Sequence, residues 1–449
     1  MSPLASARRL AIPERSRRGA VMIIVMWVCL GLVALTVYFA DEMVSELRAA
    51  DNRVQEVAAR QAAAGGTRYA AFVLSQYATN GMVPYLDDYL YEEVPVGEAS
   101  FWFLGRDPDQ PPTQDPVFGL VDEASKINLN TASRGMLEAI PGMTPELADA
   151  IVSWRARSQG GLGDSTYGRL DPPRVNKGGP FESVDELRLV YGATLDLLFG
   201  EDTNRNGALD DNENDGDQSA PRDNLDGLID PGILEYVTVY SREPNTRSSG
   251  GRRINISTAQ GRQQLLPTLQ RVFGGGRAQQ ILVAAGGGEI RSVAEFMVES
   301  RMTAEEFSQV RGEITVSNGS TVQGLINVNT ACETVLACIP GIGPENAAAI
   351  VAYRLANPGQ RTSFAWLTEV LNRNAIVRAG PYLTDRSYQF TADVVAVAHN
   401  GRGHFRTRTV FDMSRSTPRI IYHQDLTSYG WALGAQLRLA LREARENRL

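Results

Sequence analysis

The sequence predicts an α+β protein in which an N-terminal transmembrane helix precedes strands and a large region of repeated helices. Three observations predict it. Residues 20–40 form an apolar run without a charged side chain. A helical unit occurs at 126–155 and again at 325–354, and strand-like segments lie before and after this region. Helices and strands thus occupy separate parts of the chain, which is the α+β class.

The apolar run is long enough to span a bilayer. Its residues 20–40 correspond to about 31 Å of helix, against a hydrocarbon core of about 30 Å. The first proline after the start of the run is Pro84, so we expect one helix that continues from the membrane into solvent. The positive-inside rule predicts a single pass with a cytoplasmic N-terminus. The residues before the run include one acid, Glu14, and five arginines, Arg8, Arg9, Arg15, Arg17 and Arg18.

The junction between these basic residues and the run resembles the leader of type IV prepilins and pseudopilins. Two arginines and Gly19 stand directly before the small residue Ala20. In those proteins a peptidase cuts after a glycine on the cytoplasmic side of the apolar helix, so the resemblance implies cleavage between Gly19 and Ala20. The fifth mature residue would then be Ile24, where most pilins carry glutamate. An uncleaved signal anchor is the alternative.

An internal repeat occupies the middle of the chain. The segments 126–155 and 325–354 align without a gap, and a weaker third copy begins with RINISTA at 253–259. Such self-similarity indicates one supersecondary unit that is used more than once. The identical pairs include Ile127/Ile326, Asn128/Asn327, Asn130/Asn329, Thr131/Thr330, Pro141/Pro340, Gly142/Gly341, Ile151/Ile350 and Arg155/Arg354.

Each of the two clear copies predicts a pair of helices joined by a Pro-Gly turn. Thr131 and Thr330 are the expected N-caps of the first helix in each pair. The arrangement is similar to the helix-hairpin-helix of DNA-binding proteins, where backbone N–H groups and basic side chains hold phosphate. Here Glu146 and Glu345 follow the turns, so we expect structural helix pairing rather than DNA binding.

Charge and motifs exclude several function classes. The formal net charge is −8, and residues 201–230 account for all of it with ten acids and two arginines. A globally basic nucleic-acid binder is therefore not expected, whereas a local cation site is. The nucleophile-elbow, P-loop and dinucleotide-binding motifs do not occur, and the cysteines and histidines are not at zinc spacing. We predict no catalytic residues and no enzyme.

The acidic stretch 200–217 matches the calcium-loop pattern D-x-[DN]-x-[DN]-G-x5-E at every ligand position. Such a loop wraps about six to eight oxygens around one ion, and a glycine at position six, here Gly207, allows the sharp turn. The sequence therefore predicts one calcium site, and a solvated acidic loop is the alternative. The predicted ligands are Asp202, Asn204, Asn206, the carbonyl of Ala208, Asp210 and Glu213.

A second stretch, 222–233, repeats the pattern imperfectly. Arg222 and Ile233 occupy positions one and twelve, where their side chains cannot bind calcium. Asp223 or Glu235 is the expected substitute. A second calcium ion is therefore left open, with a solvated loop as the alternative. Its candidate ligands are Asp223, Asn224, Asp226 and Asp230.

Taken in this order, the features resemble one family, the general secretion pathway protein K (GspK) minor pseudopilins of the type II secretion system. The resemblance covers most of the chain. It is carried by the leader junction, by Ile24, and by the segments INLNTA…IPG…LADAIVSWR, GPFESVDELRLVYG, EYVTVYS and RINISTA. It implies a pilin-type helix and an antiparallel sheet, with a large α-helical domain of helix-hairpin-helix-like (SAM-like) repeats inserted between strands. It also implies calcium sites.

The chain divides accordingly into a leader, a transmembrane helix, a first pseudopilin segment, an insert and a last pseudopilin segment. The insert holds the calcium loops at 200–235. Strands are expected at 99–105 and 117–124 before the insert and at 388–399 and 404–414 after it, and 437–449 is expected to be a short helix or a tail. The five parts are 1–19, 20–40, 41–125, 126–383 and 384–449.

The resemblance implies a structural subunit of protein export. A prepilin peptidase would trim the chain, whose helix would lie in the bacterial inner membrane and whose bulk would be periplasmic. Minor pseudopilins I and J and the major pseudopilin are the implied partners, and nucleic acid is not. The implied place is the tip of the periplasmic pseudopilus, where the chain would help nucleate assembly. The alternatives are a membrane-anchored DNA-uptake protein that uses the hairpins, and a type IV pilus minor subunit.

Overall fold

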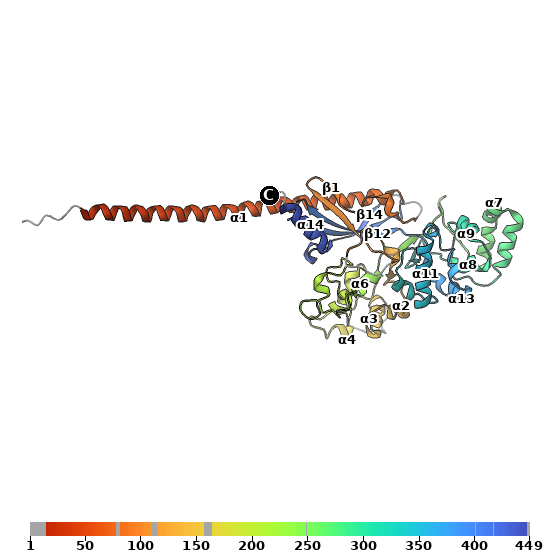
Figure 1. Ribbon diagram of the computed structural model, residues 1–449. Helices are drawn as coiled ribbons and strands as arrows, with labels where there is room; N and C mark the ends of the chain where they lie inside the picture. The colour runs from red at the N-terminus through yellow and green to blue at the C-terminus, as the bar shows by residue number, and fades with distance from the viewer. Residues whose placement is uncertain are drawn as a thin grey trace, which may run out of the picture.

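The computed structural model describes residues 15–77, 81–109, 115–156, 164–247, 249–399, 401–415 and 417–446. Its longest element is helix α1 (Arg15–Ser75), whose N-terminal part projects away from the rest of the molecule (Figure 1). Residues 21–50 are exposed throughout, and the helix packs against other elements only beyond them. The apolar run and the segment after it therefore form one helix. Residues 1–14 of the predicted leader lie outside the described residues.

An antiparallel sheet lies beside the C-terminal part of α1, and with the helices between its strands it confirms the predicted α+β class. The strand order is β1-β2-β12-β13-β14, and β3 also pairs with β12. All ten residues of the central strand β12 are buried. The strands are β1 (Val94–Val96), β2 (Ala99–Leu104), β3 (Val121–Asp122), β12 (Gln389–Ala398), β13 (His404–Asp412) and β14 (Arg419–Asp425).

Three predicted strands lie in this sheet within two residues of their expected ends, as β2, β12 and β13. The segment 117–124 is shorter than expected, because a 3-10 turn (Glu123–Ser125) ends β3. The Asp122 side chain accepts a hydrogen bond from the Ala124 N–H at 2.8 Å and stabilises that turn. Strand β14 was not predicted. It lies at the sheet edge, where no regular burial alternation marks it.

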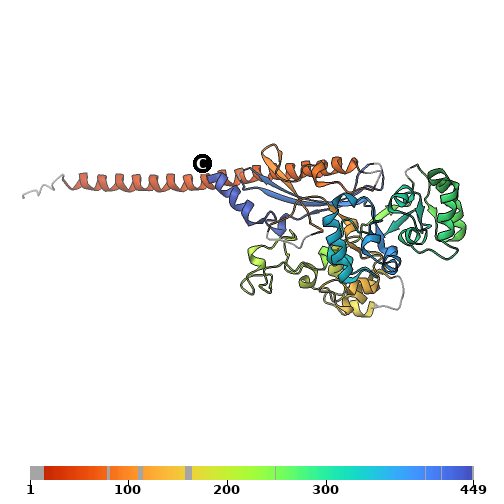
Figure 2. The same ribbon diagram turned by 45° about the vertical axis from the view of Figure 1, so that its right-hand side comes forward.

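The C-terminal part of α1 packs on the sheet through its smallest residues. Ala59, Ala62, Ala63 and Ala70 are fully buried there. A Cβ atom added to Gly66 would lie 2.7 Å from Val394 Cγ1, so the helix backbone and β12 are in close contact. The strand residues of this core are Ala99, Phe101, Phe103, Phe390, Ala392, Val394, Ala396 and Phe411. The other face of the sheet is covered by the C-terminal segment, which ends in α14 (Gly434–Glu446) (Figure 2).

Between β3 and β12 the chain forms three helical units, each closed by a pair of two-residue parallel strands. We call the units by these limits: unit 1 is 127–238, unit 2 is 254–315 and unit 3 is 326–384. The weak third copy seen in the sequence is thus a complete unit. The closing pairs are β4 (Ile127–Asn128) with β5 (Val237–Thr238), β7 (Ile254–Asn255) with β8 (Ile314–Thr315), and β10 (Ile326–Asn327) with β11 (Leu383–Thr384).

The same hydrogen bonds recur at the closure of every unit. The opening-strand asparagine accepts from the backbone N–H two residues later and donates its amide to a residue just after the closing strand, as Asn128 does to Ser241. Asn255 and Asn327 make the equivalent bonds to Asn318 and Ser387. The repeated asparagine is therefore a structural residue that seals each unit.

The helices of the units are short, apart from α7 and α11. In unit 1 they are α2 (Arg134–Glu138), α3 (Pro145–Arg155), α4 (Asp164–Tyr167), α5 (Leu195–Phe199) and α6 (Ile233–Tyr236). Unit 2 has α7 (Ala259–Ala284), α8 (Val293–Glu299) and α9 (Ala304–Val310). Unit 3 has α10 (Glu333–Ala337), α11 (Gly343–Ala356), α12 (Leu367–Val370) and α13 (Arg373–Ala379).

The expected N-caps of α2 and α10 are wrong. Both helices begin two residues later than predicted, so Ser133 caps α2 and Cys332 takes the cap position of α10 without a side-chain hydrogen bond. Thr131 and Thr330 instead belong to the turn that follows the opening strand. There the Thr330 hydroxyl donates to Asp122, which joins unit 3 to the sheet.

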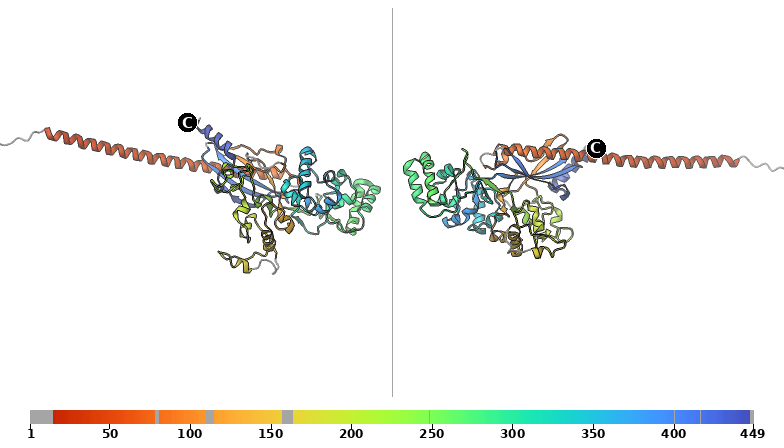
Figure 3. Two further views of the ribbon diagram at one scale, coloured as in Figure 1. Left: turned by 60° about the horizontal axis from the view of Figure 1, so that its bottom comes forward. Right: turned by 180° about the vertical axis from the view of Figure 1, so that it is seen from behind.

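Unit 2 is itself an insertion. The strands that flank it, β6 (Arg242–Pro244) and β9 (Thr321–Gln323), pair with each other antiparallel. Unit 2 therefore leaves from a two-stranded stalk, and its helix α7 lies at the end of the molecule opposite the free end of α1 (Figures 1 and 3).

Candidate functional site

The first candidate site is the exposed N-terminal part of α1. Among the described residues, α1 is the one helix that is long and apolar enough to cross a membrane. Gly19 and Ala20 lie within its helical range, at the start of this part. Ile24 is 62% exposed and belongs to a continuous apolar surface. In water such a surface would be costly, so it requires lipid or other helices around it.

The second candidate site is the loop between α5 and the 3-10 turn Asp211–Glu213, which contains the predicted calcium ligands. Its first half folds around Asp202, whose carboxylate accepts from the backbone N–H groups of Asn206 and Gly207, both at 2.9 Å. Gly207 has φ +74°, which allows the sharp turn at position six. The structure therefore has the backbone turn that the sequence pattern predicts.

The amide side chains of the loop point toward Asp210. Asn204 and Asn206 donate to the same oxygen of Asp210, at 2.6 and 3.0 Å. Their own Oδ1 atoms accept from backbone N–H groups two residues later, at 2.9 and 2.8 Å. A cation in this loop would replace the two amide donors as the partner of Asp210.

Glu213 closes the loop from position twelve. Its two oxygens accept from the N–H groups of Thr203 and Asp210, at 3.2 and 3.1 Å, so it joins the start of the loop to position nine. The residue is 1% exposed. Burial raises its pKa to about 8, and the neighbouring carboxylates Asp202 and Asp210 contribute. A buried carboxylate of this kind is stabilised by a cation.

The donors of this loop are all oxygens, which suits calcium. Burial also raises the pKa values of Asp202 and Asp210. Within the described ranges, no group of three or more His, Cys, Asp or Glu side chains lies close enough to hold a metal ion. The amide oxygens of Asn204 and Asn206 and the carbonyl of Ala208 would therefore have to complete the set. The residues fit calcium by donor chemistry.

The second loop repeats part of this geometry. Asn224 accepts from Asp226 N–H at 2.8 Å and donates to Asp230 at 3.1 Å, as Asn204 does in the first loop. The Asp223 carboxylate makes different contacts, because one oxygen accepts from the backbone N–H groups of Asp215 and Gly216 and the other from Leu225 N–H at 2.9 Å. The structure thus brings together three of the four predicted residues in the pattern of the first loop.

A residue outside the second loop closes it, in place of Asp223 and Glu235, the expected substitutes for the residues at positions one and twelve. The Glu201 carboxylate accepts from the N–H groups of Asn224 and Asp230, at 3.3 and 3.0 Å, which parallels the role of Glu213. Glu235 instead binds Arg106 at 2.7 Å, and this guanidinium and Lys126 lower its pKa to about 2 despite burial. The spacing within 222–233 carries no signal for Glu201.

The hairpins of units 1 and 3 differ in exposure. Gly142 is open to solvent, whereas a Cβ atom on Gly341 would lie 2.7 Å from Arg378 Cβ of α13, so the second hairpin is covered by its own unit. In unit 1 Thr144 caps α3, and the nearby Arg134 is bound to Asp149. These contacts suit helix pairing within the protein.

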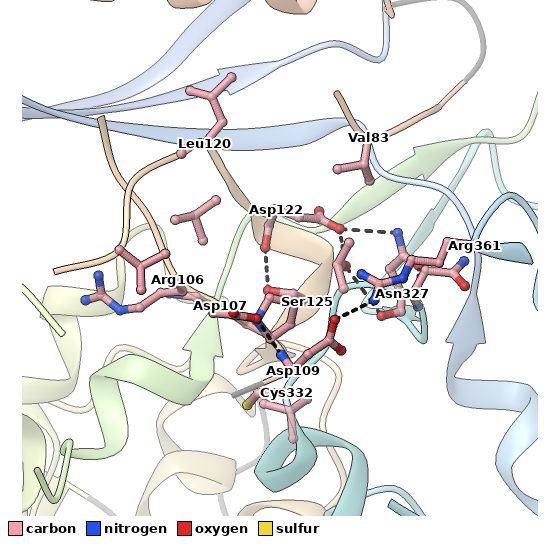
Figure 4. Close-up of a pocket in the computed structure, with 18 of the residues that line it drawn as sticks. Val83, Arg106, Asp107, Asp109, Leu120, Asp122, Ser125, Asn327, Cys332 and Arg361 are labelled. Atoms are coloured by element: carbon pink, nitrogen blue, oxygen red, sulfur yellow. Dashed lines mark hydrogen bonds and ion pairs between the residues drawn. The ribbon is translucent and has the colours of Figure 1, made fainter. Parts of the chain in front are cut away.

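A cavity of about 1140 Å³ lies between the sheet and the insert (Figure 4). Two buried acids in its wall hold the insert in place. Asp122 accepts from Thr330 at 2.6 Å and from Asn327 at 3.3 Å, and burial raises its pKa to about 6. Asp109 pairs with Arg361 at 2.6 Å and with Arg354 at 2.9 Å. Since these carboxylates already have partners, their role is to join the two parts of the molecule.

Comparison with known proteins gives matches to a family model and to solved structures. The family model of the helix-hairpin-helix motif matches residues 122–161, which confirms the helix pair predicted from the first repeat. Among solved structures, the chain is similar to one in the crystal structure of the GspK-GspI-GspJ complex from the type 2 secretion system of enterotoxigenic Escherichia coli. The sequences are 12% identical, the alignment covers 85% of this chain and 99% of that chain, and the TM-score is 0.39. The comparison with curated proteins found no significant match.

Proposed function

We propose that this chain is a minor pseudopilin of the type II secretion system, a structural subunit anchored in the bacterial inner membrane with its bulk in the periplasm. The observation that carries the proposal is the course of α1. One helix presents an exposed apolar surface over residues 21–40 and then packs its small residues on an antiparallel sheet. A helix of this kind can be extracted from lipid and stacked against other helices while the head stays folded.

The first expectation of this proposal is processing by a prepilin peptidase. Basic residues directly before Gly19 would hold the scissile bond at the cytoplasmic surface, and cleavage before Ala20 would leave the membrane helix intact. Mass spectrometry of the N-terminus from native membranes tests this. A mature chain that starts at Ala20 supports the proposal, and one that starts at Met1 or beyond residue 40 overturns it.

The proposed position is the tip of the pseudopilus, and Ile24 supports it. Cleavage creates an α-amino group at Ala20, and burying that charge in a helical stack is costly unless a carboxylate pairs with it. The glutamate of other pilins is the natural partner. A subunit with isoleucine at this place cannot neutralise the α-amino group of an adjacent subunit. It therefore fits best at the end of the fibre, where that adjacent subunit is absent. The insert between β3 and β12 would also crowd a shaft but fits at its end.

Immunogold labelling with an antibody against the insert tests the position. Label at one end of overproduced pseudopili is the expected result, and label along the shaft would contradict it. Ile24→Glu provides a second test, with Ile23→Glu as a control for a charge at the neighbouring apolar position. The tip role predicts that Ile24→Glu is neutral or harmful to secretion, so improved secretion by this variant would be evidence against it.

The proposed partners are minor pseudopilins I and J, the major pseudopilin and the prepilin peptidase. We also propose that the loop 202–213 binds calcium, with a second ion at 223–230 as an extension. The buried carboxylates of Asp202 and Glu213 favour a cation, and calcium would fix the loop against the sheet.

The helix-hairpin-helix match at 122–161 favours one second candidate, a membrane-anchored DNA-uptake protein. Fluorescence anisotropy with duplex DNA at low salt separates the two. Binding that falls steeply with salt and is lost when the exposed hairpin carries Gly142→Asp would support DNA uptake. The pseudopilin proposal predicts the same weak signal for wild type and variant.

A further inference from the structure

Two arginines of the pseudopilin sheet contact the backbone of the first calcium loop. Arg406 of β13 is fully buried and donates to the carbonyls of Asn204 and Arg205, at 2.5 and 2.8 Å. Arg106, just after β2, donates to the carbonyls of Arg205 and Asn206, both at 3.2 Å. Three consecutive carbonyls of the loop are therefore held by guanidinium groups from the sheet.

The side chains of Asn204 and Asn206 lie on the side of the loop backbone that faces away from the two arginines. The amides of Asn204 and Asn206 point to Asp210 inside the loop, while their carbonyls face the arginines. A group that orders the inside of the turn therefore also fixes the direction of the carbonyls. Gly207 joins the two sides, because a Cβ atom there would lie 2.7 Å from the Arg106 guanidinium carbon.

Each arginine is in turn anchored to a carboxylate. Arg406 binds both oxygens of Asp393 in the central strand, at 2.9 and 2.8 Å. Arg106 binds Glu235, at 2.7 and 3.2 Å, and Glu235 lies in α6 at the end of unit 1. Each guanidinium group is thus held between a carboxylate and the carbonyls of the loop.

We propose that Arg106 and Arg406 couple cation binding in the loop 202–213 to the docking of unit 1 on the pseudopilin sheet. The inference rests on the proposed calcium site. Binding energies are linked reciprocally, so a sheet that holds the carbonyls raises the affinity of the loop for calcium, and calcium holds unit 1 on the sheet. The two arginines are positioning residues, since they bind the backbone of the loop and do not contact the ion.

The test uses the full chain in detergent and measures calcium affinity by titration calorimetry. The double variant Arg106→Gln with Glu235→Gln removes one guanidinium clamp and keeps the net charge. The matched control is Arg242→Gln with Asp412→Asn. It removes another ion pair between the insert and the sheet, in which the Arg242 guanidinium lies 2.5 Å from the Asp412 carboxylate and neither residue belongs to the loop. Coupling predicts that Kd for calcium rises at least about fivefold in the first variant and stays within twofold in the control.

Electrostatics alone predicts the opposite effect on calcium affinity when only the charge of Arg106 is removed. Arg106 lies 4.0 Å from Asp202, so removing its charge alone should tighten cation binding. Arg106→Lys keeps the charge but loses the forked donors, and coupling predicts weaker binding in this variant too. Calcium binding that is unchanged or tighter in both the Arg106→Gln, Glu235→Gln variant and the Arg106→Lys variant would overturn the proposal.

Hydrogen exchange gives an independent reading on β13 and on residues 105–106. Calcium should slow exchange there in the wild type and in the control. In the Arg106→Gln, Glu235→Gln variant, which keeps the Arg406 contacts, calcium should slow exchange less at residues 105–106 than in the wild type. Exchange in EGTA that matches wild type outside unit 1 shows that this variant is folded. Wild type that binds no calcium would overturn the coupling and leave the pseudopilin proposal intact, because α1 and its processing are tested separately.

Discussion

The two adjacent glycines of α1 offer a sharp test of how this helix lies on the sheet. Gly65 and Gly66 are in the same helical turn, so alanine at either position gains the same helix propensity, about 0.5–1 kcal/mol. Their surroundings differ. A Cβ atom on Gly65 would meet Val96 at 3.4 Å, which is an ordinary contact. A Cβ atom on Gly66 would lie 2.7 Å from Val394 and 3.0 Å from Phe101.

Both neighbours of Gly66 are closely packed core residues, so the added methyl group forces a shift that costs about 1–3 kcal/mol. Gly65→Ala should therefore stabilise the docked helix by about 0.5–1 kcal/mol. Gly66→Ala should be neutral or destabilise it by up to about 2 kcal/mol, which leaves a difference between the variants of about 1–3 kcal/mol.

Native-state hydrogen exchange of the full chain measures this difference locally. Peptides from 58–75 and 389–398 report the opening free energy of the helix and of β12, and peptides from unit 2 serve as an internal reference. Equal stabilisation by both substitutions would refute the packing of α1 described above, because the propensity gain alone would then explain the data.

Two further predictions concern calcium and pH. Asp202→Ala with Glu213→Ala should lower the melting temperature in calcium to the value in EGTA. The reason is that wild type gains about 2.7 kcal/mol of stability when calcium is at 100 times its Kd. Identical melting of wild type in calcium and in EGTA would mean that the loop is solvated and binds no ion. The pKa of Asp122 is raised from 3.8 to about 6, so the folded chain keeps a proton that the unfolded chain releases. The free energy of unfolding should therefore fall between pH 4 and pH 6, by at most about 1.4 kcal/mol per unit from this group. Urea titrations should show this slope reduced in Asp122→Asn, and an unchanged slope would assign it to other carboxylates.

The elements that the sequence predicted well are those with local signals. The long apolar helix needs only the absence of charge over 20–40, and the backbone turn of the loop 202–213 needs only the spacing of its residues. The helix pairs were visible because two copies of one unit share identities at gapless spacing. In each case the residues that define the feature lie within about one supersecondary element of each other.

What the sequence could not predict depends on contacts between distant segments. Glu201 closes the second acidic loop only because Gly200 forms a bridge with Pro231, which brings two loops together. The caps of α2 and α10 were misplaced because Thr131 and Thr330 suit a cap equally well, and the choice is made by the turn after the opening strand. The completeness of unit 2 shows only when Ile254 pairs with Ile314.

The nested strand pairs of this chain set an order for its folding. Asn245 N–H donates to the Ser320 carbonyl at 3.0 Å, so the segments that flank unit 2 lie next to each other. The sheet closes over a far longer interval, as the hydrogen bond between Thr391 and Glu123 spans 268 residues. Because long chain closures are slow and short ones are fast, the units should form before the sheet can. The strands after the insert are synthesised last, so the small, sheet-facing residues of α1 stay uncovered until those strands are made. That interval is when a chaperone or a neighbouring subunit would have most to gain from binding this helix.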